Sequence, residues 1–131
     1  MTTPAEIIKN HAVVRLDREA SVHHSGHQPV HARRYVLPRR SGTAVEVVII
    51  VKDNLQLWCE ALPLDRLNGT TLGGTFRPGS ETYAKTNDVG QLLYGRHSAL
   101  KTMDRLHRGN AWFFKPQTVV DLNAVLDALA A

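Results

Sequence analysis

The feature that most constrains the fold of this chain is a run of β-branched residues at positions 44–51. The run reads AVEVVIIV, and Glu46 is its only polar residue. β-branched side chains favour extended backbone, and a short run that is apolar on both faces is typical of a strand in the middle of a sheet. We therefore predict that residues 44–51 form the central strand.

Strands are also predicted before and after this run. Residues 33–37 form a short strand that ends at Pro38, because proline cannot donate a backbone hydrogen bond to a neighbouring strand. Asp53 and Asn54 make a two-residue connection, and apolar and polar side chains then alternate over residues 55–61, which indicates a hairpin. A last strand, rich in aromatic residues, is predicted over residues 111–115.

The first 22 residues have two interpretations. Thr3, Pro4 and Glu6 have the spacing of a helix-capping box, with proline at the first helical position. In one interpretation a short helix reaches about Asn10, and the alternating residues 12–22 form a half-buried strand. In the other, a single helix covers residues 4–20 with its charged side chains in water. Both remain open from the sequence.

A second capping box, at Thr118, begins the predicted C-terminal helix. Leu122, Val125, Leu126 and Leu129 lie on one face of that helix, which should pack on the sheet. Strands come first and helices later, so the fold class is α+β, with a mainly antiparallel sheet of about four to five strands. With 131 residues, of which 43% are hydrophobic, residues 1–131 are predicted to form a single globular domain.

A pair of helices is predicted before the last strand. The first is short and ends at Gly95, and the second has Ser98 as its cap and runs to Arg108, with Gly109 as its stop. Together with the last strand, residues 88–115 resemble a helix-turn-helix with one wing strand, as in winged-helix proteins. They depart from that family because no convincing helix comes immediately before the pair.

The second helix of this pair is predicted to be buried on one side and basic on the other. Arg96 and His97 would lie at its N-terminal end, where a recognition helix meets base edges. A second basic patch precedes the central strand. The predicted nucleic-acid contacts in the two regions are Arg33, Arg34, Arg96, His97, Lys101, Arg105 and Arg108.

We therefore predict a small nucleic-acid-binding protein that uses this basic helix. The net charge of +4, with histidine counted as neutral, favours an anionic partner, and lysine and arginine are the residues that contact phosphates. The competing interpretation is that the cations only keep a surface helix in water. The sequence leaves open whether the partner is DNA or RNA.

Four histidines within nine residues suggest a different site. His23, His24, His27 and His31 lie in a segment where Gly26 and Pro29 predict a loop. Neutral imidazole is a good ligand for a divalent transition metal, so His23, His27 and His31 are candidate metal ligands. A histidine-dependent metal enzyme is thus one alternative function, and loop histidines without any ligand are the other interpretation.

A glycine-rich segment offers a candidate anion site. Arg77 and Ser80 follow Gly73 and Gly74, and together they would suit a phosphate or carboxylate. Glycines that simply permit a turn explain the same pattern.

A further alternative function is a non-catalytic small-molecule or protein-interaction module. It would act as a homodimer through its sheet, with Trp58, Trp112 and Phe114 lining a pocket or interface.

Several classes of protein do not fit the sequence. The motifs GxSxG, GK[ST] and HExxH are absent, so catalysis is uncertain and less expected than binding. The longest apolar run, residues 47–51, is too short for a membrane span, and residues 1–10 do not resemble a secretory signal. The single cysteine, Cys59, cannot form an internal disulfide, and we expect it to be a buried, inert thiol. A cytoplasmic location is the resulting expectation.

Overall fold

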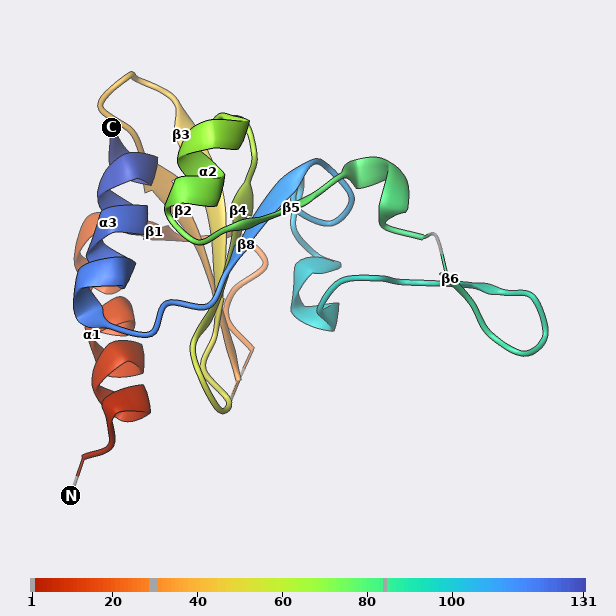
Figure 1. Ribbon diagram of the computed structural model, residues 1–131, viewed down its shortest axis with the longest axis horizontal. Coiled ribbons are helices and arrows are strands. Elements are labelled where there is room, and N and C mark those ends of the chain that lie inside the picture. Colours follow the sequence, from red (N-terminus) through yellow and green to blue (C-terminus); the bar gives the residue numbers. More distant parts are fainter. Residues whose placement is uncertain (1, 29–30, 84) are drawn as a thin grey trace.

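The computed structural model describes residues 2–28, 31–83 and 85–131. Its main feature is a six-stranded antiparallel sheet with the strand order β1-β2-β3-β4-β8-β5 (Figure 1). The predicted α+β class is confirmed, with more strands than the four to five expected. The strands of this sheet are β1 (Ser21–Val22), β2 (Ala32–Pro38), β3 (Ala44–Ile50), β4 (Gln56–Glu60), β5 (Thr75–Arg77) and β8 (Ala111–Phe114).

The central strand is β3, as predicted. It pairs with β2 on one side and with β4 on the other, and its residues from Val45 onward are buried. Val47 and Ile49 belong to a hydrophobic cluster on one face of the sheet, whereas Val48 and Ile50 belong to a second cluster on the opposite face. The sheet therefore has two apolar faces, and each needs a cover.

Two helices cover the first face. These are α1 (Pro4–Glu19) and α3 (Val119–Ala130), which lie beside each other along the sheet (Figure 1). On α1, the buried residues Ile8, Ala12 and Leu16 are spaced by four, so one stripe of the helix packs on the sheet. The long-helix interpretation of the N-terminal region is thus correct, and the predicted strand over residues 12–22 is wrong except at β1.

Both predicted capping boxes begin a helix. The Thr3 hydroxyl accepts a hydrogen bond from the backbone N–H of Glu6 at 3.2 Å, and the Glu6 carboxylate accepts one from the backbone N–H of Thr3 at 3.4 Å. At α3, the Thr118 hydroxyl accepts from the backbone N–H of Asp121 at 3.0 Å. Each cap satisfies N–H groups that have no partner inside the helix.

Residues 94–110 cover the second face, and we call them the covering segment. They contain a short 3₁₀ helix, η2 (Ser98–Leu100), followed by turns, so the predicted α-helix from Ser98 to Arg108 is wrong. The apolar side chains expected on the buried face of that helix are nevertheless buried against Val48, Ile50 and their neighbours. These side chains are Ala99, Leu100, Met103 and Leu106. Apolar spacing indicated which side chains are buried but not the backbone conformation.

The first helix of the predicted pair is also wrong. A hairpin of β6 (Lys85–Thr86) and β7 (Leu92–Leu93) replaces it and extends away from the sheet (Figure 1). The Asn87 side chain accepts hydrogen bonds from the backbone N–H groups of Val89 and Gln91, and Gly90 has a φ of 82°. This turn interrupts any helix, because positive φ is readily adopted only by glycine. The resemblance to a winged helix therefore fails.

Two short helices, with β5 between them, lie between β4 and the hairpin. The helix α2 (Arg66–Thr71) follows β4, and the 3₁₀ helix η1 (Gly79–Glu81) follows β5. The Asp65 carboxylate caps α2 by accepting from the backbone N–H of Asn68 at 2.7 Å. Across the described ranges, none of the helices has the length and apolar character needed to span a bilayer.

Candidate functional site

A buried carboxylate on β3 holds the covering segment in place. Glu46 is 1% exposed. Its Oε1 accepts hydrogen bonds from the backbone N–H groups of Arg105 at 2.8 Å and Leu106 at 2.9 Å, and its Oε2 accepts one from Asp104 at 3.1 Å. Three N–H donors offset the free energy that burying a carboxylate would otherwise cost. These N–H groups therefore bind a side chain of the sheet, whereas in an α-helix they would bind carbonyls of their own segment.

Two histidines and a second carboxylate adjoin Glu46. His23 Nε2 lies 3.1 Å from Glu46 Oε2 and 3.3 Å from Asp104 Oδ2. His24 Nε2 lies 2.8 Å from the same Asp104 Oδ2, and the centroids of the two imidazole rings are 4.2 Å apart. We call His23, His24, Glu46 and Asp104 the histidine–carboxylate cluster.

Hydrogen bonds determine the protonation within this cluster. The backbone N–H of Ser25 donates to His23 Nδ1 at 3.2 Å. A ring nitrogen that accepts carries no proton, so neutral His23 has its proton on Nε2 and donates it to Glu46. The hydrogen bond from His24 lowers the pKa of Asp104, so that Asp104 is a carboxylate at neutral pH.

Of the three predicted metal ligands, only His23 belongs to the cluster. His27 is used elsewhere, because its Nδ1 accepts the backbone N–H of Arg34 at 2.9 Å and its ring packs beside Tyr35. Burial lowers the pKa of His27. His31 is exposed just before β2. The prediction relied on closeness in the sequence within a loop, which does not determine whether the imidazoles meet in the folded chain.

Two of the predicted nucleic-acid contacts are buried. Arg34 is 6% exposed and donates to the carbonyls of Ala99 at 2.8 Å and Gly26 at 3.0 Å. Arg96 is 7% exposed and donates to the carbonyls of Leu106 at 2.9 Å and Arg77 at 3.1 Å. The prediction is wrong for both residues, because the guanidinium groups bind backbone oxygens inside the protein.

The other predicted contacts are divided between paired and exposed side chains. Arg105 forms an ion pair with Glu60, whose hydrogen bond raises the pKa of Arg105. Arg33 lies 3.5 Å from Asp17 and donates to the hydroxyl of Tyr35 at 3.0 Å.

His97 caps η2, since its Nδ1 accepts the backbone N–H of Ala99 at 3.0 Å. Lys101 and Arg108 are exposed. The four residues of the predicted basic face, His97, Lys101, Arg105 and Arg108, do not form one face, because the helix that would align them is not present in the described covering segment.

Cations and aromatic rings gather where the sheet meets the covering segment. The rings of Trp58 and Phe113 are stacked, with centroids 4.8 Å apart and an interplanar angle of 10°. The Arg77 guanidinium carbon lies 5.1 Å from the Trp58 ring centroid, and Lys115 Nζ lies 5.7 Å from that of Phe113. Lys101 Nζ lies 5.3 Å from the ring centroid of Tyr94.

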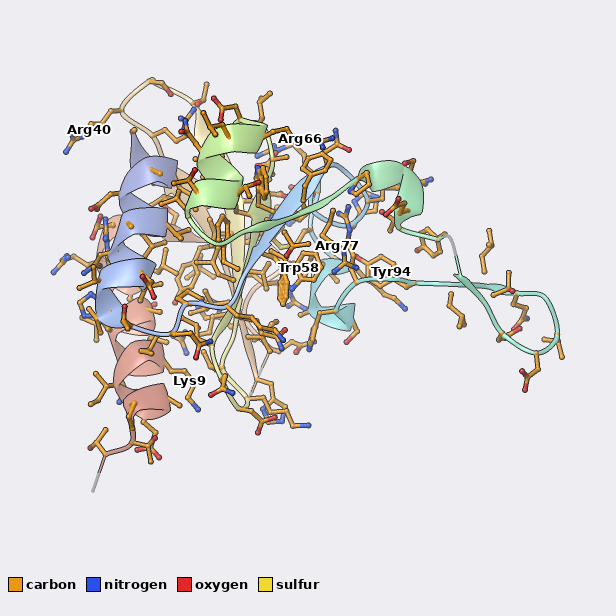
Figure 2. All side chains as sticks on the ribbon, in the orientation of Figure 1. Lys9, Arg40, Trp58, Arg66, Arg77 and Tyr94 are labelled. Atoms are coloured by element: carbon orange, nitrogen blue, oxygen red, sulfur yellow. The ribbon has the colours of Figure 1, made fainter. Side chains whose placement is uncertain are left out.

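We call these six residues the aromatic–cation surface. Figure 2 labels three of them. Arg77 lies over the Trp58 ring, and Tyr94, in the covering segment, packs against the hydrophobic cluster that contains Trp58. Trp58 itself is 3% exposed, and its indole Nε1 has no hydrogen-bond partner among the described residues. Phe113 is half-buried, so its ring is the one on β8 that a ligand can contact.

A pocket opens beside Phe113. It has a volume of about 350 Å³ and is lined by Gly73, Thr75, Arg77, Phe113 and Lys115. Arg77 is thus the member of the predicted anion site that reaches this pocket, where it also donates to the carbonyl of Gly95 at 2.9 Å. Ser80 is exposed on η1 and is not among the lining residues.

The aromatic residues predicted to line a pocket or interface are buried, although Trp112 lines one pocket and Phe114 another. Trp112 and Phe114 are buried in the first hydrophobic cluster, and Trp58 is buried in the second. The Trp112 indole donates to the carbonyl of Leu64 at 3.1 Å. Cys59 is a buried free thiol, as expected, and burial raises its pKa, so that it is not a nucleophile at neutral pH.

Comparison with protein-family models, with curated proteins and with solved structures gave no match for this chain. The candidate sites therefore rest on geometry.

The sequence did not predict six of the residues that form the two sites. They are His24, Glu46 and Asp104 of the histidine–carboxylate cluster and Tyr94, Phe113 and Lys115 of the aromatic–cation surface. One usable signal existed for Glu46, because a lone carboxylate in an apolar strand must find hydrogen-bond donors when it is buried. The other five are brought to their positions by the fold.

Proposed function

We propose that this protein binds single-stranded nucleic acid through the aromatic–cation surface. The observation that carries the proposal is the half-buried ring of Phe113 with Arg77 and Lys115 beside it in one pocket. A base can stack on an aromatic ring while neighbouring cations contact its phosphate, and this combination is common in single-strand binding sites.

The charge of the surrounding surface supports an anionic ligand. The chain carries a net charge of +4. In the covering segment, the pKa of His97 is lowered by burial first and then by nearby cations, among them Arg34 and Lys52. Of these two, Lys52 is exposed, so a polyanion that reaches both Lys101 and Lys52 would gain favourable interactions.

The shape of the covering segment favours single strands over duplex. A recognition helix reads the major groove of duplex DNA, but residues 94–110 form a 3₁₀ helix and turns. Stacking on Phe113 requires a base that is not paired and stacked within a duplex. We therefore expect weaker binding to duplex than to single strands.

The first test reverses two exposed charges of the proposed surface. Lys101→Glu with Lys115→Glu should weaken binding of a fluorescent single-stranded oligonucleotide by at least about tenfold, because both changes remove phosphate contacts. Fluorescence polarisation over a salt series should also show a slope of log K against log salt that is smaller by about 0.7 for each cation lost.

A matched control keeps the same change in net charge. Lys9→Glu with Arg40→Glu alters two residues that Figure 2 shows on the helix-covered side, away from Trp58 and Arg77. This variant should bind nearly as tightly as the wild type. If both double variants lose the same affinity, the loss reflects the net charge of the protein and not the proposed surface. If the wild type does not bind single strands at low salt, the proposal is wrong.

Stacking is tested separately from charge. Phe113→Leu keeps an apolar side chain against Trp58 but removes the flat ring, so binding to single strands should weaken by about 1 kcal/mol or more. Binding to duplex should change little. Unchanged single-strand binding in Phe113→Leu would show that bases do not stack at this position.

A further inference from the structure

We propose that His23, His24 and Asp104 bind a divalent first-row transition metal ion, with the Glu46 carboxylate beside it. This inference is independent of nucleic-acid binding. It rests on the histidine–carboxylate cluster, which joins the end of β1 to the covering segment.

The positions of the donor atoms suit a small cation. One ligand atom from each of His23, His24 and Asp104 lies within 4.8 Å of the others. Two ligands of a tetrahedral zinc ion are about 3.3 Å apart when each metal bond is about 2.0–2.1 Å long. His23 Nε2 and Asp104 Oδ2 already have a separation of 3.3 Å. His24 Nε2 is closer, at 2.8 Å, but its side chain is exposed and can move outward.

The charges of the cluster also favour a divalent ion. In neutral form the two imidazoles contribute no charge, whereas Glu46 and Asp104 contribute two negative charges when both are ionised. A divalent cation would neutralise the charges of the Glu46 and Asp104 carboxylates, which now accept hydrogen bonds from the two imidazoles. Glu46 is held rigidly by three backbone N–H groups, so its charge stays next to the site.

A second layer of contacts would orient the buried ligand. His23 Nδ1 lies 2.8 Å from the Ser25 hydroxyl. When His23 Nε2 binds a metal, its proton moves to Nδ1. The hydrogen bond from the Ser25 backbone N–H to Nδ1 is then lost, and Nδ1 can donate to the Ser25 hydroxyl instead. Metal-bound histidines usually donate their other N–H in this way, which fixes the ring orientation.

The ligand types identify the class of metal. Imidazole with carboxylate suits zinc, nickel, copper or iron(II), whereas magnesium and calcium prefer oxygen ligands alone. A bound ion would connect two segments that are 80 residues apart, so it should stabilise the folded state.

The experiment is calorimetric titration of the chelator-treated, untagged protein with zinc chloride and nickel chloride, and with magnesium chloride for comparison. We expect one zinc or nickel ion per chain at micromolar affinity or tighter, and no binding of magnesium. His24→Ala and Asp104→Asn each remove an exposed ligand and should weaken zinc binding by at least about tenfold. Mutating a residue that only hydrogen-bonds to a metal ligand already weakens metal affinity by about that much.

His31→Ala is the matched control, because it removes an exposed histidine of the same region that lies outside the cluster. It should leave zinc affinity and the zinc-induced rise in melting temperature unchanged. Zinc binding that persists in both His24→Ala and Asp104→Asn would overturn the proposed site. Loss of binding in His31→Ala, or no zinc binding by the wild type at 100-fold excess, would overturn it as well.

Discussion

Glu46 links the central strand to the covering segment through a single side chain. Its two oxygens accept three backbone N–H groups and lie beside His23, while it remains almost fully buried. An N–H group that is buried without an acceptor destabilises the folded state by about 1–3 kcal/mol. The conformation of residues 104–106 therefore depends on this carboxylate.

We predict that Glu46→Ala lowers the free energy of unfolding by about 3 kcal/mol or more, because the N–H donors lose their common acceptor. Urea unfolding followed by tryptophan fluorescence measures the change. Glu81→Ala removes an exposed carboxylate from η1 and should alter stability by less than about 0.5 kcal/mol. A Glu46→Ala variant as stable as Glu81→Ala would show that water replaces the carboxylate without loss.

Among the elements, α2 shows how packing can outweigh helix propensity. Gly69 lies within this helix and is buried under the Trp112 ring. A Cβ atom at this position would lie 2.3 Å from Trp112 Cζ2, which is far inside van der Waals contact. Trp112 cannot move freely, because it is part of the core and donates to the Leu64 carbonyl.

We predict that Gly69→Ala destabilises the protein by about 1 kcal/mol or more. Alanine is favoured over glycine in a helix by about 1 kcal/mol, but overpacking a core costs about 1–3 kcal/mol and displaces the indole. Thermal unfolding measures the effect, with Thr70→Ala on the exposed side of α2 as the control. A higher melting temperature for Gly69→Ala than for the wild type would contradict this account.

The covering segment shows where sequence periodicity misleads at the level of an element. Leu100, Met103 and Leu106 recur at helical spacing, and all three are buried as an amphipathic helix would require. The periodicity of apolar residues predicts which side chains are buried. It does not predict which acceptors the backbone N–H groups bind, and here the N–H groups of residues 104–106 bind Glu46 on β3. The same segment carries both Lys101 and Asp104, so it contributes to each proposed site.

In the whole molecule, the β6–β7 hairpin stands apart from the six-stranded sheet. Figure 1 shows it extending from the rest of the structure. Val89 is 77% exposed, and Leu92 and Leu93 are exposed as well. A two-stranded hairpin is only marginally stable in water, and the apolar side chains described in this one are exposed, so it should open more readily than the sheet.

We predict that thermolysin, which cuts before large apolar residues, first cleaves this protein at Val89, Leu92 or Leu93. Mass spectrometry of the fragments after brief digestion would identify the cut. The Leu55 and Leu57 bonds near β4 should resist much longer, because both residues are buried in the core. Early cleavage at β4 would contradict the difference in local stability.

Sequence alone determined the parts of this protein whose interactions are local. The central strand, its pairing with β4 and the caps at Thr3 and Thr118 depend on neighbours in the chain, so their patterns could be read without a structure. The predicted two-residue connection at Asp53 and Asn54 is wrong, because residues 51–55 join β3 to β4. The choice between a short and a long N-terminal helix remained open, because it depended on which side chains the sheet could bury.

Only the tertiary structure decided the conformation of the covering segment and the positions of the site residues. The acceptor for the backbone N–H groups of residues 104–106 lies on β3, 58–60 positions away, and His24 meets Asp104 across 80 positions. Arg34 and Arg96 look like surface cations in the sequence, yet backbone carbonyls brought close by the fold bind them inside. Charge and spacing describe what a side chain can do, whereas its partners depend on which distant segments the folded core brings together.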